Sequence, residues 1–308
     1  MAEGKERVAL DNVSPLPTMT QAREPEPTRP ERVEALTRIC AEQLLRAFGL
    51  GNGTRTLELL ARFPAERLAR QVATYDEVVG ESGLAAGGAW ALELMVRSVE
   101  VEGRENVPAH GPVLFTANHP GLADCLALFA TIAREDLRVV AAENPLLDAL
   151  PNTSRYLISV SEDSSGRLGV VRTAARHLKR DGALLTFPGG RIEPDPAVLP
   201  GARDALERWS ESLDLFARLV PDLKVVPAVV SGVLSPLALR NPLIQVRRHR
   251  RDREWLAATL QMLTPALRNV TTRVDFGRPM STEDVPDGSV REAVLDETRR
   301  LIERCAAS

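Results

Sequence analysis

The first regular pattern along the chain is helical. Apolar side chains recur at three- and four-residue spacing between Leu36 and Phe48, and a glycine-rich turn at residues 49–53 ends the run. Residues 56–62 predict a short second helix, and Pro64 is expected to open a third that continues to about residue 79. The glycines expected to break this third helix are Gly80, Gly83, Gly87 and Gly88. The pattern therefore predicts a helical subdomain over residues 31–88.

After Gly88 short apolar runs alternate with helical patterns. Strands are predicted at residues 99–102, 113–117, 137–142, 156–160, 183–187, 224–230 and 271–276. Helices are predicted at residues 124–134, 168–180, 202–219, 252–267 and 289–305. Several strands are apolar at consecutive positions, as expected when helices cover both faces of a sheet. The sequence thus predicts an α/β fold over residues 89–308, with a mixed, mostly buried sheet flanked by helices.

Composition and charge narrow the class of protein. Of the 308 residues 44% are hydrophobic, enough for a substantial core, and the net charge of −3 excludes the basic field typical of nucleic-acid-binding proteins. Three scattered cysteines favour a reducing cytoplasm over a disulfide framework. Residues 1–30 are rich in proline and charge, and they predict a disordered arm without a signal peptide. The longest uncharged stretch, residues 225–239, is shorter than the roughly 20 residues that cross a bilayer, so no transmembrane helix is expected.

A histidine and an aspartate stand in a polar loop directly after the strand predicted at 113–117. The loop reads N-H-P-G-L-A-D from Asn118 to Asp124, and its Pro-Gly pair bends it so that His119 and Asp124 face each other. A carboxylate that accepts from one imidazole nitrogen fixes the tautomer and leaves the other nitrogen as a base. In the alternative interpretation Asp124 only caps the next helix and His119 is an ordinary turn residue. The place of the loop, at the carboxyl end of a strand, favours a catalytic pair.

A second polar loop follows the strand predicted at 183–187 and reads F-P-G-G-R-I-E from Phe187 to Glu193. Gly189 and Gly190 let backbone N–H groups approach an anion closely, and Arg191 can pair with its charge. The alternative is an ordinary glycine turn with a solvated Arg–Glu pair. A third segment, the apolar run V-V-P-A-V-V within the strand predicted at 224–230, is typical of a core strand that could also line an acyl slot.

In this order and spacing, the three segments resemble the glycerolipid (lysophospholipid) acyltransferase family, which includes the 1-acyl-glycerol-3-phosphate acyltransferases. The family pattern has N-H-x-x-x-x-D, an arginine-bearing block, F-P-E-G-T-R and an apolar V-P strand. The matching residues are Asn118, His119 and Asp124 in the first block, Phe187, Pro188 and Gly190 in the third, and Val226 and Pro227 in the fourth. The resemblance covers roughly residues 97–281, and it implies a glycerol-phosphate acyltransferase-like α/β fold.

Two blocks depart from the family pattern. Gly189 replaces the third-block glutamate and Arg-Ile replaces its Thr-Arg, so that with Glu193 the block resembles the P-G-G-x-x-E form of diacylglycerol acyltransferase-like branches. The second-block arginine is missing, and Arg167 and Arg172 are candidate substitutes. In the phosphate-acceptor branch these blocks hold the phosphorylated headgroup. The departures therefore leave the acceptor open while the base is unchanged.

The resemblance implies an enzyme that transfers a fatty acyl group from acyl-CoA or acyl carrier protein to a hydroxyl of a lysophospholipid or glycerolipid. His119 would be the general base and Asp124 would orient it. From the resemblance and the loop chemistry, we expect seven residues to bind substrate: Asn118, Gly189, Gly190, Arg191, Glu193, Arg167 and Arg172. No metal and no cofactor beyond the thioester co-substrate is expected, because the four histidines form no ligand-spaced cluster.

Three other functions stay open at this point. The acceptor can be a neutral or non-glycerolipid alcohol, which the altered third block favours. The acceptor can also be water, which would make the protein a thioester hydrolase of the same fold. A non-catalytic lipid-binding protein is the third, and the presence of both His119 and Asp124 argues against it.

Two segments bear on membrane contact. The basic stretch of Arg240, Arg247, Arg248, Arg250, Arg251 and Arg253 is either a solvated face or a docking site for anionic lipid or for the CoA phosphates. The apolar segment at residues 89–96 is expected to pack in the core rather than to enter a membrane. We therefore expect a cytoplasmic protein, with a peripheral contact to the inner membrane face as an option.

Overall fold

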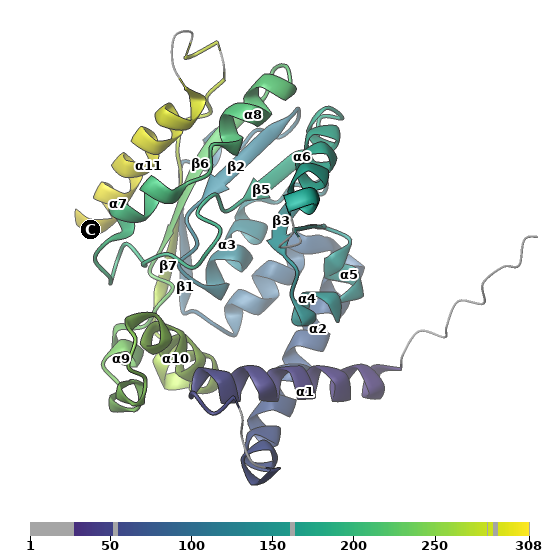
Figure 1. Cartoon of the computed structure of the whole chain (residues 1–308), viewed down its shortest axis with the longest axis vertical. Coiled ribbons are helices and arrows are strands. Elements are labelled where there is room, and N and C mark those ends of the chain that lie inside the picture. Colours follow the sequence, from purple (N-terminus) through teal and green to yellow (C-terminus); the bar gives the residue numbers. More distant parts are fainter. Residues whose placement is uncertain (1–27, 52–54, 161–163, 282, 286–288, 308) are drawn as a thin grey trace, which may run out of the picture.

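The computed structural model describes residues 28–51, 55–160, 164–281, 283–285 and 289–307 (Figure 1). The predicted N-terminal arm lies outside the described residues except for its last three positions. The seven predicted strands are all present: β1 (Ser98–Glu102), β2 (Val113–Ala117), β3 (Arg138–Ala142), β4 (Leu157–Val160), β5 (Ala183–Thr186), β6 (Lys224–Ser231) and β7 (Thr271–Phe276). The longer helices are α1 (Arg29–Ala47), α2 (Arg55–Glu93), α3 (Leu122–Ile132), α6 (Ser164–Leu178), α8 (Ser212–Leu219), α10 (Arg250–Leu263) and α11 (Val290–Ala307). Short helical turns are α4 (Pro145–Asp148), α5 (Pro151–Ser154), α7 (Ala202–Ala205) and α9 (Pro236–Leu239), with 3-10 turns η1 (Arg104–Asn106), η2 (Leu206–Arg208), η3 (Pro242–Val246) and η4 (Pro265–Leu267).

The strands form one mixed sheet in the order β1-β7-β6-β2-β5-β3-β4. Strands β2 to β6 run parallel to one another, whereas β7 is antiparallel to β6 and parallel to β1. The predicted α/β class with a mixed sheet is therefore confirmed. Because β6, β2 and β5 are neighbours and parallel, the loops that follow them emerge at the same edge of the sheet.

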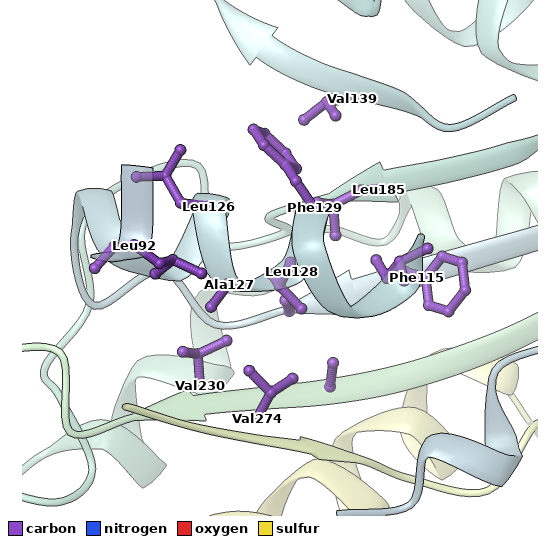
Figure 2. Close-up of a cluster of buried hydrophobic side chains, with 14 of the residues drawn as sticks. Leu92, Phe115, Leu126, Ala127, Leu128, Phe129, Val139, Leu185, Val230 and Val274 are labelled. Atoms are coloured by element: carbon purple, nitrogen blue, oxygen red, sulfur yellow. The ribbon is translucent and has the colours of Figure 1, made fainter. Parts of the chain in front are cut away.

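Helices cover both faces of the sheet and divide the core into two layers. Successive side chains of a strand point to opposite faces, so Val113 and Phe115 of β2 pack with α2 and α3, whereas Leu114 packs with α6, α8 and α11. Figure 2 shows α3, with Leu128 and Phe129, lying over strands that carry Phe115, Leu185 and Val230. This two-sided burial explains why the strands appeared in the sequence as continuous apolar runs.

The helix α2 differs from the sequence prediction. Pro64 lies inside the helix instead of opening it, and the interruption occurs at Gly83, where φ is +85°. Gly80 and Gly88 lie within the helix, and each permits a close contact that a side chain would prevent. A Cβ at Gly88 would lie 2.7 Å from the carbonyl oxygen of Leu126 in α3, and one at Gly80 would lie 2.7 Å from the Asn152 side chain. These glycines therefore serve helix packing, which overrides their low helix propensity.

The N-terminal helices are fastened to the α/β core. The boundary predicted at residue 88 falls inside α2, and Leu84 and Leu92 of this helix belong to the same core layer as α3. The segment 89–96 thus packs in the core, as expected. Earlier in α2, the fully buried Asp76 accepts hydrogen bonds of 2.8 Å from both the backbone N–H and the hydroxyl of Thr153 in α5. The helices α1 and α2 also pack tightly on one another across a separate small core.

The single helix predicted over residues 202–219 is wrong. The chain forms α7, η2 and α8 instead, and Trp209 between them has an extended backbone with φ −64° and ψ 133°. Its indole is buried and hydrogen-bonded to Glu193. This tertiary contact holds residues 209–211 out of the helix. Within the described part of the chain, no helix is both long and apolar enough to cross a bilayer.

Candidate active site

Three loops meet at the carboxyl ends of adjacent parallel strands. Residues 118–124 follow β2, residues 187–195 follow β5, and residues 232–234 follow β6. Hydrogen bonds join the loops directly: the Glu193 N–H donates to the carbonyl of His119 at 2.8 Å, and the Asp195 carboxylate accepts from the N–H groups of residues 232–234. The structure therefore brings together the three segments that the sequence singled out.

His119 and Asp124 form the pair that their spacing predicted. The Nδ1 atom of His119 lies 2.9 Å from Oδ2 of Asp124, whose side chain is fully buried, while the imidazole keeps 25% of its surface exposed. Asp124 can only accept here, so the imidazole carries a proton on Nδ1 and presents Nε2 as the unprotonated nitrogen. Nε2 has no hydrogen-bond partner among the described residues, and the imidazole is open to solvent on part of its surface.

The aspartate has two roles at once. Its Oδ2 also accepts the Gly121 N–H at 2.9 Å, at the start of α3. Capping and orientation of His119 were alternatives at the level of sequence, and the geometry shows that one oxygen does both. The partial positive charge at the amino end of α3 further stabilises the carboxylate.

The environment of His119 keeps it a basic group. Burial lowers the pKa of His119, but the charge and the hydrogen bond of Asp124, together with the charge of Glu193, outweigh burial and raise the pKa above its ordinary value. The Phe187 ring packs against the imidazole with 4.6 Å between ring centroids. The ring restricts the motion of the histidine, so both its orientation and its basicity are set by neighbours.

Glu193 holds the backbone around His119. One oxygen, Oε2, accepts the His119 N–H at 3.2 Å, and the other, Oε1, accepts the indole N–H of Trp209 at 2.9 Å. Burial raises the pKa of Glu193 above its ordinary value, against the hydrogen bonds from Trp209 and His119. Both oxygens are thus engaged by the protein. The structure gives this predicted substrate-binding residue a positioning contact.

Asn118 also contacts the protein rather than open space. Its side chain is 2% exposed, its amide nitrogen donates to the carbonyl of Val230 at 2.9 Å, and its amide oxygen accepts the Val230 N–H at 2.7 Å. These two bonds fasten the His119 loop to β6. The structure thus shows Asn118 positioning the loop, and its expected role in substrate binding stays a prediction.

Asp195 is a site residue that the sequence analysis missed. Its fully buried carboxylate accepts the N–H groups of Gly232, Val233 and Leu234 at 2.8–3.0 Å, and also that of Ala197. Gly232 has φ +69°, and a Cβ there would lie 2.3 Å from the carbonyl oxygen of Thr271, so the turn requires glycine. The signal in the sequence was an acid between Pro194 and Pro196, two residues after Glu193.

The remaining predicted binding residues lie on or near the surface. Gly190 and Arg191 are exposed, and the Gly190 N–H already donates to the carbonyl of Phe187, whereas the Gly189 N–H has no partner among the described residues. Arg172 is exposed on α6 and forms no hydrogen bond or ion pair with the described part of the His119 region. The side chain of Arg167 lies outside the described residues. The sequence analysis also missed Arg208, whose charge acts on Glu193.

Cys125 lies beside the pair without the properties of a nucleophile. Burial and the Asp124 charge raise the pKa of its thiol well above the ordinary value, which keeps the thiol protonated. His119, Asp124 and Cys125 offer atoms within 4.8 Å of one another, the spacing of a metal site. They fit a metal poorly, because the thiol holds its proton and Oδ2 of Asp124 already accepts from His119 and Gly121.

A hollow of about 980 Å³ lies elsewhere on the molecule. Its lining includes Arg104, His110, Arg134 and Asp181, near the residues where β2 and β5 begin. The hollow therefore lies at the amino ends of these strands, whereas His119 lies at their carboxyl ends. None of the predicted site residues lines this hollow.

Comparison with known proteins gives a family match for the part of the chain that carries these loops. The family described as Acyltransferase matches residues 98–231, which include β1 to β6 and both polar loops. Among solved structures, the chain resembles the 1-acyl-sn-glycerophosphate (LPA) acyltransferase PlsC from Thermotoga maritima at 18% identity and a TM-score of 0.44, over 88% of this chain and 99% of that one. No curated protein matches the sequence. Residues 98–231, somewhat less than half of the chain, thus match the Acyltransferase family, and this stretch carries His119, Asp124 and Glu193.

Proposed function

We propose that the protein is an acyltransferase that moves a fatty acyl group from a thioester, acyl-CoA or acyl carrier protein, to the hydroxyl of a lysophospholipid or glycerolipid. The observation that carries the proposal is the His119–Asp124 pair: Nδ1 is held at 2.9 Å by a buried carboxylate while the imidazole stays partly exposed. Such a pair is suited to take a proton from a hydroxyl that comes from solvent. The match to the acyltransferase family supports the type of reaction.

The transfer would proceed in one attack with His119 as the proton carrier. The acceptor oxygen attacks the thioester carbonyl as its proton passes to Nε2 of His119. The C–S bond then breaks, and the leaving thiolate takes that proton from the imidazolium, which Asp124 stabilises in the meantime. The N–H of Gly189, which has no partner among the described residues, would be a donor for the oxygen that becomes negative in the intermediate. A direct attack fits better than an acyl-enzyme, because the nearby Cys125 thiol keeps its proton.

Cations near the base bear on the acceptor. Arg191 is exposed in the loop after β5, and Arg208 lies close enough to influence Glu193. Both guanidinium groups are suited to a phosphate on the acceptor or on the donor. Replacing Arg191 and Arg208 by Gln should raise the KM for a lysophospholipid more than for a neutral alcohol. If the replacement changed the KM by the same factor for both classes of acceptor, or changed neither, the result would instead favour a neutral or non-glycerolipid alcohol.

The assay that tests the base is thiol release from acyl-CoA with and without an acceptor. His119→Ala should lower turnover by about 10²–10⁴-fold, the usual contribution of a positioned acid–base group. His110→Ala is the matched control, since His110 is exposed and lies in the hollow at the amino ends of the strands. Full turnover of His119→Ala would refute the mechanism. Thiol release that is equally fast without an acceptor would identify a thioester hydrolase.

A peripheral membrane contact belongs to the same proposal. Exposed apolar side chains, Leu237, Leu243, Val246 and Trp255, lie on α9, η3 and α10. The basic stretch of the sequence overlaps these elements, but Arg247 pairs with Asp252 and Arg250 with Glu254. Arg240, Arg248 and Arg251 are exposed and form no ion pair with the described residues, so they are the arginines left for anionic lipid. A cytoplasmic location remains a prediction.

A further inference from the structure

Gly189 and Glu193 share one space in the loop after β5. A Cβ built on Gly189 would lie 2.2 Å from Oε1 of Glu193 and 3.0 Å from its carboxyl carbon. The direction in which a side chain at position 189 would leave the backbone is thus occupied by the carboxylate from four residues later. Position 189 is also where the F-P-E-G-T-R pattern carries its glutamate.

The carboxylate in this space is bound from two sides. Oε2 accepts the backbone N–H of His119 and Oε1 accepts the indole N–H of Trp209, while the Glu193 N–H donates to the carbonyl of His119. Glu193 is only 4% exposed. Three hydrogen bonds therefore connect its backbone and side chain to the catalytic loop on one side and to the break between η2 and α8 on the other.

We infer that Glu193 is a positioning residue that replaces the missing glutamate of position 189, fixing the backbone of His119 through the space that Gly189 leaves open. The inference rests on His119 as the proposed base. It goes beyond that proposal because it assigns to Glu193 the space that a side chain at position 189 would enter, so that the carboxylate is supplied from a different point of the chain.

The contact affects the reaction through His119. Its N–H and carbonyl are both held by Glu193, so removal of the side chain frees one of the two anchors of the loop. A displacement of about 1 Å of a reacting group costs up to roughly 10²-fold in rate. The charge of Glu193 also contributes to the raised pKa of His119, so its loss has an effect on proton affinity that a purely structural residue would not have.

The first experiment compares Glu193→Gln and Glu193→Ala with Glu207→Gln. Glu207 is an exposed acid on η2, so its replacement removes the same charge from the same region without touching His119. The readouts are the NMR titration of the His119 imidazole in the resting enzyme, kcat, and KM. Both Glu193 variants should lower the pKa of His119. Glu193→Ala should lower kcat by about 10²-fold with little change in KM for the thioester, and Glu193→Gln should lie between it and the wild type.

The second experiment moves the carboxylate. The double variant Gly189→Glu/Glu193→Ala should recover a substantial part of the kcat lost in Glu193→Ala, together with the pKa of His119; an aspartate at 189 tests the reach. Unchanged kcat and an unchanged His119 titration in folded Glu193→Ala would overturn the positioning role. If neither Gly189→Glu/Glu193→Ala nor Gly189→Asp/Glu193→Ala recovered kcat or the His119 titration, the inference that Glu193 replaces a carboxylate at position 189 would be overturned. Because the titration needs no turnover, it remains decisive even if His119→Ala were active and the proposed function failed.

Discussion

Replacing Asp124 by Asn tests the central pair most directly, because it removes a charge and an acceptor while keeping the shape. Asp124 is fully buried, and its charge and hydrogen bond are the two largest influences that raise the pKa of His119. An asparagine can turn its NH₂ group toward Nδ1, which would leave the imidazole proton on Nε2, where a base must be unprotonated. We therefore expect kcat/KM to fall by about 10²–10⁴-fold.

The pH dependence of the same variant has a definite sign. As the proposed base, His119 would act only when neutral, so we expect activity of the wild type to fall as the pH drops through the raised pKa of His119. Without Asp124 the lowering effect of burial remains while the main raising influences are gone, so the acidic limb of kcat/KM should move to lower pH. The assay is thiol release over the acidic and neutral range, with Asp204→Asn, an exposed acid on α7, as control. An unchanged rate, or a limb that moves to higher pH, would refute the reasoning.

Three further predictions follow from other contacts. Asp195→Ala leaves the N–H groups of residues 232–234 without their acceptor and should lower the free energy of unfolding by about 3 kcal/mol; a denaturation midpoint equal to that of the wild type would contradict this role. Gly189→Ala should displace the Glu193 carboxylate and lower kcat without unfolding the protein, and it should have little further effect in Glu193→Ala, because the two changes act on one contact. Arg248→Ser/Arg251→Ser should weaken sedimentation with anionic vesicles, whereas Arg176→Ser/Arg180→Ser on and after α6 should not; equal binding of both variants would leave the basic stretch a solvated face.

The strands could be predicted from the sequence because their environment is uniform. Strand β2 is buried on both faces, and its apolar run from Val113 to Ala117 ends at a polar loop, so its bounds are found to the residue. The course of the glycine-containing helix α2 could not be predicted in this way. Gly80 and Gly88 are helix breakers by propensity, and only the neighbouring Asn152 and α3 show why a small residue is needed there.

The residues of the candidate site likewise fall into two groups, those that the sequence predicts and those that only the structure reveals. His119 and Asp124 are five residues apart and interact within one loop, so their relation is visible in the sequence. Trp209 and Asp195 act through partners 16 and 37–39 residues away, across loops whose arrangement depends on the order of the strands. A periodicity argument placed Trp209 in a helix, because helical spacing is a local property and the hydrogen bond that breaks the helix is not.

The three buried carboxylates of the site suggest how one base can serve different acceptors. Asp124 fixes the imidazole, Glu193 the backbone of His119, and Asp195 the turn after β6, and each does so through backbone or ring N–H groups that depend little on neighbouring side chains. Between the buried Pro188 and Glu193, by contrast, Arg191 and Ile192 are exposed and make no side-chain hydrogen bond with the described residues. Substitutions at these two positions can therefore change what the loop contacts without moving the base. Under the proposed function, we therefore expect the exposed residues of this loop to select the acceptor, while the backbone held by the three carboxylates positions the proposed base.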